Sequence, residues 1–410
     1  MRYGIAIVVE GLHTGLIGAY GSNTAVTQAI DRMAAFGLVL DQCFVDSLDL
    51  TQQLRSLWTG RHAVQASQGT WSMWQEVMEA GIECCLITDC PLVASIAEEL
   101  GCPRVTLVAT EQRRDPAIDW TECALMQVFA ATVEELESLD SETMIWVHSR
   151  GLRHAWDAPI EFRQRFIDPE DPLPPSESCV PDIVIDKHTD PDEIVGWAQV
   201  AAAQVAVVDR ALEVVLSAIE ARSDAGNWSS MLLSLGGVPL GEHGRLGWGE
   251  PQLHGEEMSC LAIVHPADWL PVGQRRAELC QLPDLMPTWL EAMGITSARP
   301  AGCWGRSVLG MGPFTAPHEW PAYFQTAYSV HDSGTEWIRT PAWSSLLGSE
   351  DKRSLYVKPD DRWEVSDVAT RRVNIVDQLQ DLIESFKHCL RTNTRDELPQ
   401  LSDELCNLIR

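Results

Sequence analysis

Short apolar runs alternate with amphipathic stretches through most of this chain. Unbroken apolar runs of this length predict buried strands, whereas apolar positions at helical spacing predict amphipathic helices. Strands are predicted over residues 3–9, 38–44, 81–88, 104–108, 143–148 and 230–235. Helices are predicted over residues 24–36, 51–59, 91–100, 132–139 and 193–220. This alternation predicts an α/β fold with a mostly parallel sheet flanked by helices on both faces.

Two irregular stretches interrupt the pattern. Residues 168–182 are rich in Pro, Asp and Glu and predict a loop excursion, and residues 313–331 are also loop-like. Short strand signals follow over residues 335–356, and a closing helix is predicted over residues 375–390. We therefore expect a main α/β domain over residues 1–314 and a smaller C-terminal α+β subdomain over residues 315–410.

Acidic residues outnumber basic ones across the 410 residues, and the formal net charge is -29. Such a surface repels nucleic acid and anionic membranes, so neither is expected as a partner. The sequence shows no apolar run of about 18 residues and no cleavable signal pattern. Its twelve cysteines include no C-x-x-C pair. These features predict a cytoplasmic protein with free thiols and without a zinc site.

Seven segments have the form of motifs that occur in the same order in one enzyme family. They are residues 8–21 (VVEGLHTGLIGAYG), 29–37 (AIDRMAAFG), 56–61 (SLWTGR), 157–166 (DAPIEFRQRF), 239–244 (PLGEHG), 282–294 (LPDLMPTWLEAMG) and 354–369 (SLYVKPDDRWEVSDVA). In this order the segments resemble the sulfatase family of the alkaline phosphatase superfamily. The resemblance covers nearly the whole chain and implies that family's α/β fold.

The resemblance also implies a metal-dependent ester hydrolysis, for which this chain lacks the ligands. A divalent cation (Ca, Mg or Zn in this family) is held by several carboxylate or amide oxygens and activates the nucleophile. The family's four ligand positions fall on Glu10, Gly11, Leu235 and Gly236, of which only Glu10 carries a carboxylate. We therefore expect a degenerate site with no metal cofactor.

The family's nucleophile and supporting groups are also replaced. The nucleophile is a formylglycine made from Cys or Ser, or a Ser or Thr in phosphatase relatives. Its position falls on Leu50, and the neighbouring Thr51 is a weak substitute because one helical step turns a side chain by about 100°. Thr51 or Asp49 is instead suited to cap the helix over residues 51–59. The family's His falls on Arg153, and its Lys falls on Glu250, which reverses the charge.

Several polar residues remain as weak candidates for a cleft. His148, His154 and His243 are candidate catalytic side chains, although each also suits a hydrogen-bonded structural role. Carboxyl ends of parallel strands line the ligand site in open α/β sheets, which favours His148. The candidates for anion binding in the cleft are Glu10, Arg55, Arg61, Arg150 and Arg153.

Two main hypotheses for the function follow. The leading one is a catalytically silent sulfatase homologue that acts as a binding or scaffold protein for a small anion or a protein partner. The alternative is an active sulfuric or phosphoric ester hydrolase with rebuilt catalytic residues. An oligomer is left open, because Trp156, Trp248 or Trp343 would mark an interface if exposed.

Overall fold

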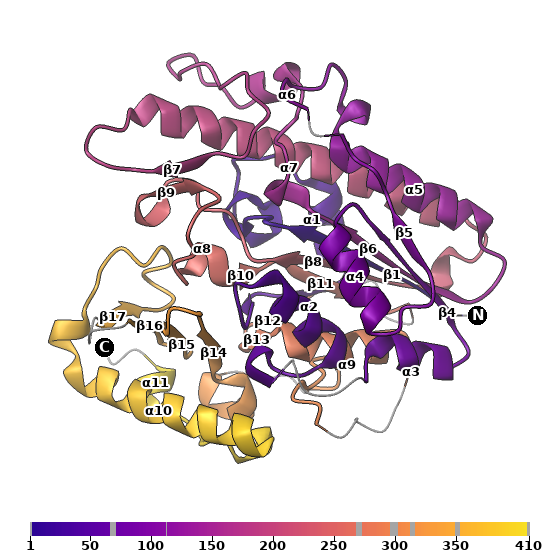
Figure 1. Ribbon diagram of the computed structural model, residues 1–410. Coiled ribbons are helices and arrows are strands. Elements are labelled where there is room, and N and C mark those ends of the chain that lie inside the picture. Colours follow the sequence, from indigo (N-terminus) through magenta and orange to yellow (C-terminus); the bar gives the residue numbers. More distant parts are fainter. Residues whose placement is uncertain are drawn as a thin grey trace.

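An eight-stranded sheet forms the centre of the molecule, which we describe from a computed structural model (Figure 1). The structure describes residues 2–65, 71–111, 113–267, 273–295, 302–311, 316–348 and 353–407. The strand order is β12-β2-β11-β8-β1-β6-β4-β5. The strands are β1 (Tyr3–Glu10), β2 (Leu38–Leu40), β4 (Glu83–Thr88), β5 (Val105–Leu107), β6 (Thr143–Ser149), β8 (Trp228–Leu235), β11 (Ala262–His265) and β12 (Gln274–Arg276). Within this sheet only β11 runs antiparallel to its neighbours, so the predicted mostly parallel sheet is confirmed.

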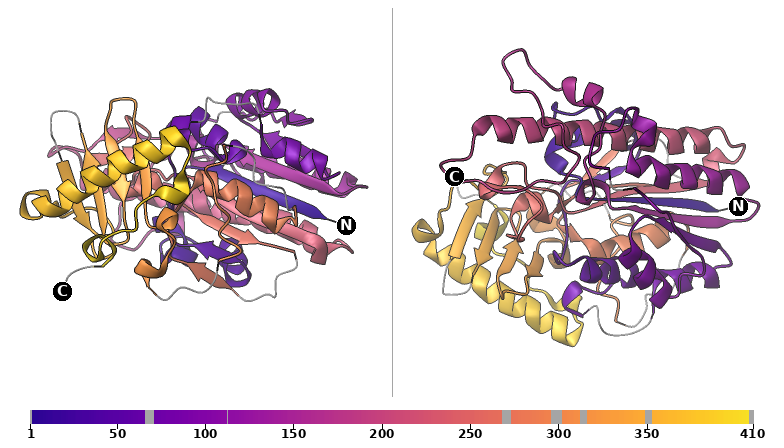
Figure 2. Two further views of the ribbon diagram at one scale, coloured as in Figure 1. Left: turned by 90° about the horizontal axis from the view of Figure 1, so that it is seen from below. Right: turned by 45° about the horizontal axis from the view of Figure 1, so that its top comes forward.

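Helices cover both faces of the sheet (Figures 1 and 2). One face carries α1 (Gln28–Phe36), α5 (Ala124–Ser138), α6 (Ile160–Gln164) and the long α7 (Pro191–Glu220). The other carries α2 (Leu50–Thr59), α3 (Met73–Glu79), α4 (Pro91–Glu99) and α9 (Leu282–Ala292). Alternate residues of β1 enter the two cores: Ile5 and Ile7 pack on one side, and Ala6 and Val8 on the other. A strand buried on both faces needs an unbroken apolar run, which is the pattern at the N-terminus.

The C-terminal subdomain follows the main domain in the sequence (Figure 2). Four antiparallel strands form its sheet: β14 (Ala327–Val330), β15 (Glu336–Arg339), β16 (Trp343–Leu347) and β17 (Arg353–Val357). The helix α10 (Val373–Thr392) packs on this sheet through a separate apolar core, and the short α11 (Asp403–Cys406) follows. The expected boundary at residues 314 and 315 lies outside the described residues.

Short strands and one short helix connect these parts. A three-stranded sheet contains β3 (Cys43–Phe44), β10 (Ser259–Cys260) and β13 (Cys280–Gln281), and β7 (Asp182–Val184) pairs with β9 (Arg245–Gly247). The helix α8 (Gly255–Met258) leads into β10. None of the helices in the described ranges combines the length and the apolar character needed to cross a lipid bilayer.

Several predicted boundaries were wrong for identifiable reasons. The predicted strand over residues 38–44 is two strands in two sheets, because the chain turns at Asp41 and Gln42 between β2 and β3. The first helix begins at Gln28 rather than at residue 24, because the backbone of Thr27 is not helical; the Thr27 side chain accepts a hydrogen bond from the backbone of Gly18 instead. The helix predicted over residues 132–139 is the end of α5, and the loop-like stretch 313–331 contains β14.

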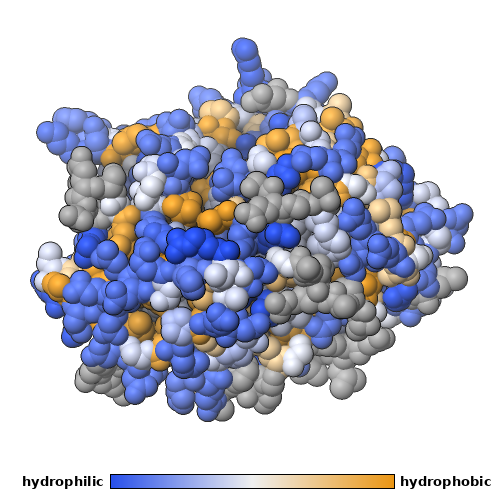
Figure 3. All heavy atoms as spheres, turned by 60° about the horizontal axis from the view of Figure 1, so that its bottom comes forward, coloured by the Kyte–Doolittle hydropathy of each residue, from blue (hydrophilic) through white to orange (hydrophobic). Residues whose placement is uncertain are grey.

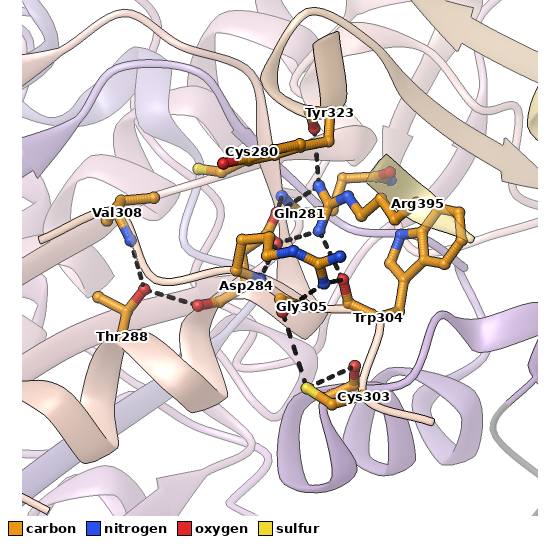
Figure 4. Close-up of polar contacts among 12 residues, drawn as sticks. Cys280, Gln281, Asp284, Thr288, Cys303, Trp304, Gly305, Val308, Tyr323 and Arg395 are labelled. Atoms are coloured by element: carbon orange, nitrogen blue, oxygen red, sulfur yellow. Dashed lines mark hydrogen bonds and ion pairs between the residues drawn. The ribbon is translucent and has the colours of Figure 1, made fainter. Parts of the chain in front are cut away.

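A buried ion pair joins the C-terminal segment to the main domain (Figure 4). Arg395 follows α10, and Asp284 lies in the first turn of α9; neither side chain is more than 2% exposed. The guanidinium contacts both carboxylate oxygens, with Nη2 3.1 Å from Oδ2, and also donates to the carbonyls of Trp304 and Tyr323. The carboxylate in turn accepts from the backbone N–H groups of Gln281 and Arg306. Every charge in this network therefore has a partner.

Candidate functional site

The carboxyl ends of β1, β6 and β8 meet where open α/β sheets bind their ligands. Glu10 is the last residue of β1 and lies beside Leu235, the last residue of β8. His148 lies near the end of β6, opposite Val8 of β1. The structure therefore brings Glu10 and Leu235 side by side, with His148 on the adjacent strand.

A buried ion pair occupies this position. The Glu10 side chain is 1% exposed, and its Oε1 lies 2.9 Å from Nε2 of His148. Its Oε2 lies 3.5 Å from Nη1 of Arg153, whose side chain is 18% exposed. Arg153 belongs to the short helical turn Gly151–Arg153 that follows β6, and its guanidinium stacks 4.2 Å above the centre of the Trp248 ring.

A second carboxyl group, that of Glu257, acts on the same guanidinium. Burial lowers the pKa of Arg153, and the charges of Glu10 and Glu257 oppose that change. Burial also raises the pKa of Glu257 to about 7, although a hydrogen bond from the backbone of Gln252 works against the rise. The site thus contains an arginine with acidic groups around it.

The two glycines at the family's ligand positions leave no room for a longer side chain. A Cβ atom built on Gly11 would lie 2.9 Å from the Trp248 ring and 3.0 Å from Val238. One built on Gly236 would lie 2.3 Å from the carbonyl oxygen of Glu257, and both glycines have positive φ angles. Hard dications take about six to eight oxygen ligands. The residues present do not fit such an ion, because the carboxylate at these positions already binds Arg153 and His148.

The nucleophile position lies at the start of α2. Asp49 caps this helix by accepting a hydrogen bond from the backbone N–H of Gln52 (2.8 Å), so Asp49 rather than Thr51 provides the cap. Leu50, the first helical residue, packs against the apolar core. The charge of Asp49 acts on the pKa of Arg153, which places this helix start close to the ion pair.

The other candidate residues are engaged elsewhere. Arg150 binds Asp89 and Thr110, and Arg55 binds Glu99 on α4. The Arg61 side chain packs against Gly302. His154 accepts from the backbone of Ala155, and burial lowers its pKa. Of the residues proposed for the cleft, the structure thus brings Glu10, His148 and Arg153 into direct contact.

The tryptophans proposed as interface markers are not exposed. Trp156 is fully buried, and Trp343 is buried against the C-terminal helix core. Trp248 lies under the Arg153 guanidinium and donates its indole N–H to the carbonyl of Leu152 (2.9 Å). These residues therefore do not support an exposed aromatic interface.

A second polar cluster joins the main domain to the C-terminal subdomain. Ligand atoms of His243, His254 and Glu364 lie within 4.8 Å of one another, as a metal site would require. However, the two imidazole rings are stacked 3.5 Å apart and nearly parallel, so their in-plane lone pairs do not converge. The Glu364 carboxylate also binds Lys358 Nζ (3.2 Å) and His254 Nδ1 (3.1 Å), and His243 binds Glu256 (2.7 Å). In this arrangement the cluster fits an ion-pair network better than a metal site.

This network predicts a pH-dependent stability. Burial by itself lowers the pKa of His243, but the hydrogen bonds and charges of Glu256 and Glu364 together outweigh it and raise the pKa above 6.5. The contribution of His243 to stability is therefore complete below pH 6.5 and is lost as pH rises through the raised value. Burial would raise the pKa of Glu364, but His254 and Lys358 lower it to about 2, so its contribution is present above pH 4.5 and is lost as pH falls towards 2.

We expect His243→Gln to lower the melting temperature at pH 6 more than at pH 9. Melting curves of the wild type and the variant between pH 5 and 9 would measure this difference. An equal loss at both pH values would show that His243 contributes through packing and not through its charge.

Sequence reasoning missed the residues from the C-terminal subdomain. Arg339, Lys358, Arg362 and Glu364 approach the main domain beside His13 and line a cavity there. Lys358, Arg362 and Glu364 fall within the motif-like segment 354–369, whereas Arg339 lies in none of the seven segments. All four lie more than 300 residues from His13, so no local signal in the sequence could have placed them beside it.

Comparison with known proteins shows the fold. No protein-family model matches the sequence, and no curated protein matches it. Solved structures do match. One is a protein bound to its substrate D-glucosamine-2-N,6-O-disulfate, with a TM-score of 0.75 and 15% identity over 97% of this chain and 100% of that one. The phosphonate monoester hydrolase of Agrobacterium radiobacter gives a TM-score of 0.75 and 12% identity, over 96% of both chains. A 2-O GAG sulfatase gives 0.69 and 16% over 99% of this chain and 95% of that one. The expected sulfatase-like fold is confirmed.

Proposed function

We propose that this chain is a binding or scaffold protein built on a sulfatase-type fold, without the metal-dependent ester hydrolysis of such enzymes. The contact between Arg153 and Glu10 carries this proposal. At the position where that chemistry requires a dication, the chain supplies a permanent cation of its own. The neighbouring glycines have no space for the missing carboxylates.

A guanidinium cannot replace the catalytic functions of a metal ion. Arginine offers only N–H donors, has no open coordination position, and does not release a proton in proteins. It cannot therefore accept a lone pair from a nucleophile or lower the pKa of a bound water. Stacking on Trp248 and pairing with Glu10 hold it in a structural role.

The remaining catalytic positions support the same proposal. Leu50 has no lone pair with which to attack an ester, so the covalent intermediate of the family cannot form there. Glu250 is exposed and carries a negative charge where the family has a Lys. With both functions lost and the scaffold intact, binding of an intact ligand is the function that these residues support best.

One observation favours the alternative of a rebuilt hydrolase. The raised pKa of Glu257, about 7, suits a general acid or base at neutral pH. Glu257 also lies within electrostatic range of Arg153. A water-based hydrolysis that used Glu257 would need neither a nucleophile at position 50 nor a metal.

A turnover assay separates the two functions. Aryl sulfate, aryl phosphate and aryl phosphonate monoesters would be assayed with and without Ca²⁺, Mg²⁺, Mn²⁺ and Zn²⁺. We expect no turnover above that of a Glu257→Gln variant purified in parallel, which controls for contaminating hydrolases. Turnover by the wild type that the Glu257→Gln variant lacks would contradict catalytic silence and establish the rebuilt hydrolase.

A further inference from the structure

A cavity of about 300 Å³ lies between the main domain and the C-terminal subdomain. His13 and Glu256 line it from the main domain, and Trp337, Arg339, Lys358 and Arg362 are among the residues that line it from the C-terminal subdomain. The Cα atom of His13 lies against Gly237, just after β8, so the cavity opens next to the carboxyl ends of the sheet. Its volume is at the lower end of the range for small-molecule sites.

The cations around this cavity are only partly neutralised. Arg275 forms a two-point ion pair with Asp41, and Lys358 binds Glu364 at 3.2 Å. The third carboxylate in the lining, Glu256, binds His243. Arg339 and Arg362 have no carboxylate within 4.0 Å among the residues that the structure describes. The cavity lining therefore keeps positive charge within a chain whose net charge is -29.

The buried Arg339 is the unusual member of this group. Its side chain is largely inaccessible, with the residue 5% exposed, and it donates only to neutral acceptors. These are the carbonyls of Thr340, Pro341 and Trp343 and, from Nη2, the Gln42 side-chain oxygen at 2.8 Å. Burial lowers the pKa of Arg339 to about 9, so the group remains protonated at neutral pH. The charge of Glu364 acts on Arg339 from beyond 4.0 Å and only partly opposes the effect of burial. A bound anion would supply the direct counter-ion that this buried charge lacks.

Arg362, an exposed residue in the cavity lining, provides a second positive charge beside Arg339. Its side chain is exposed, Nη1 donates to the carbonyl of Tyr20 (3.3 Å), and its guanidinium lies 4.9 Å from the Trp363 ring centre. Trp363 also stacks against His13, so the cavity lining combines aromatic rings with the cationic side chains. A ligand with a charged group and a ring or sugar body would contact both the cations and the aromatic rings.

We propose that this cavity binds the charged group of a phosphate or sulfate monoester and holds the ester intact. The planar guanidinium group can donate two parallel hydrogen bonds to two oxygens of such a tetrahedral oxyanion. The proposal rests on the proposed binding function and deepens it by naming the ligand class. It also places the anion beside Arg339 and Arg362, and not at the ion pair of Glu10 and Arg153.

The cavity continues into a larger groove, which leaves room for the body of a ligand. A cavity of about 1650 Å³ shares Gln42, Arg275, Lys358 and Pro359 with the smaller one. Arg371 and Arg372 also line it, and neither has a carboxylate partner among the described residues. On the lower face of the molecule, hydrophobic residues are interspersed with hydrophilic ones among the coloured atoms (Figure 3).

Calorimetric titration at constant ionic strength tests the site. The probes are glucose 6-phosphate and glucose 6-sulfate, with glucose as the uncharged control and pyrophosphate as the compact polyanion. We expect binding of at least one of the two esters by the wild type and none of glucose. The Arg362→Gln change should weaken ester binding about 10-fold, and Arg339→Gln by more. Arg362 is exposed, so its variant keeps the fold even if Arg339→Gln unfolds.

Arg165→Gln is the matched control, because it removes the same charge from a surface pair with Glu161 outside both cavities. We expect it to bind as the wild type does. The site proposal is overturned if neither ester binds, or if Arg362→Gln binds as tightly as the wild type.

The same samples separate this proposal from the proposed function. Incubation of the bound ester, followed by analysis for free glucose and released phosphate or sulfate, reports cleavage. Cleavage would contradict catalytic silence while the variant data still located the anion site. Intact esters without measurable binding would overturn the cavity proposal and leave catalytic silence standing.

Discussion

Replacing Arg153 by methionine is expected to destabilise the protein by roughly 3 kcal/mol. The change leaves the Glu10 carboxylate, 1% exposed, without its cation. Removing one partner of a buried ion pair costs about 3–5 kcal/mol, and we expect the lower end because Glu10 keeps its bond to His148. Chemical denaturation of the wild type and the variant would measure the difference in unfolding free energy.

Two further variants show whether the loss comes from the ion pair. Arg165→Met removes an arginine that is 48% exposed and paired with Glu161, itself 78% exposed, and should cost about 1 kcal/mol or less. Adding Glu10→Gln to Arg153→Met removes the unpaired charge and should recover part of the stability. A double variant as unstable as the sum of the single ones would contradict the coupling.

Replacing Arg395 by methionine is expected to cost about 3–5 kcal/mol, the range for breaking a buried pair. Asp284 would keep its backbone donors but lose the cation that neutralises it in the first turn of α9. The carbonyl of Tyr323 would lose its donor from Arg395 in the same step, whereas that of Trp304 would keep the one from Arg306. The C-terminal segment would therefore lose its buried ion pair with the domain (Figure 4).

Arg306→Met is the control for this prediction. Arg306 binds Asp396, which is 62% exposed, although the Arg306 side chain is itself 11% exposed and also donates to the carbonyls of Trp304 and Gly305. Because no buried carboxylate is left without its cation, we expect a loss of about 1–2 kcal/mol, smaller than that for Arg395→Met. Denaturation curves of both variants would separate the two roles. A loss below 1 kcal/mol for Arg395→Met would show that the buried pair is not what holds the segment.

The sequence was sufficient for the fold because its strongest signals are local. The apolar run of β1 predicted a strand with helices on both faces, and both cores receive alternate residues of that strand. The same signal misled at residues 38–44, because β2 and β3 are both apolar and the turn between them carries no Gly or Pro. Local pattern could not show that the two strands belong to different sheets.

The site was predictable only where a family motif fixed the position. Counting from the motifs identified Glu10, Gly11, Leu235 and Gly236 as the family's ligand positions. Which side chains occupy the space of the absent ligands depends on how other segments of the chain pack there. Trp248 and Glu257 fill that space from segments with no recognisable signal. The cavity around Arg339 and Arg362 is likewise formed by subdomain docking, which no spacing in the sequence encodes.

Titration of Ca²⁺, Mg²⁺ and Zn²⁺ into the wild type and Glu10→Gln, followed by calorimetry, tests the central claim most directly. The acidic surface will bind some cations weakly in both proteins. Because Arg153 occupies the carboxylate of Glu10, we predict identical isotherms for the two proteins with each ion. One equivalent of a dication bound by the wild type and absent from Glu10→Gln would contradict the replacement of the metal by arginine.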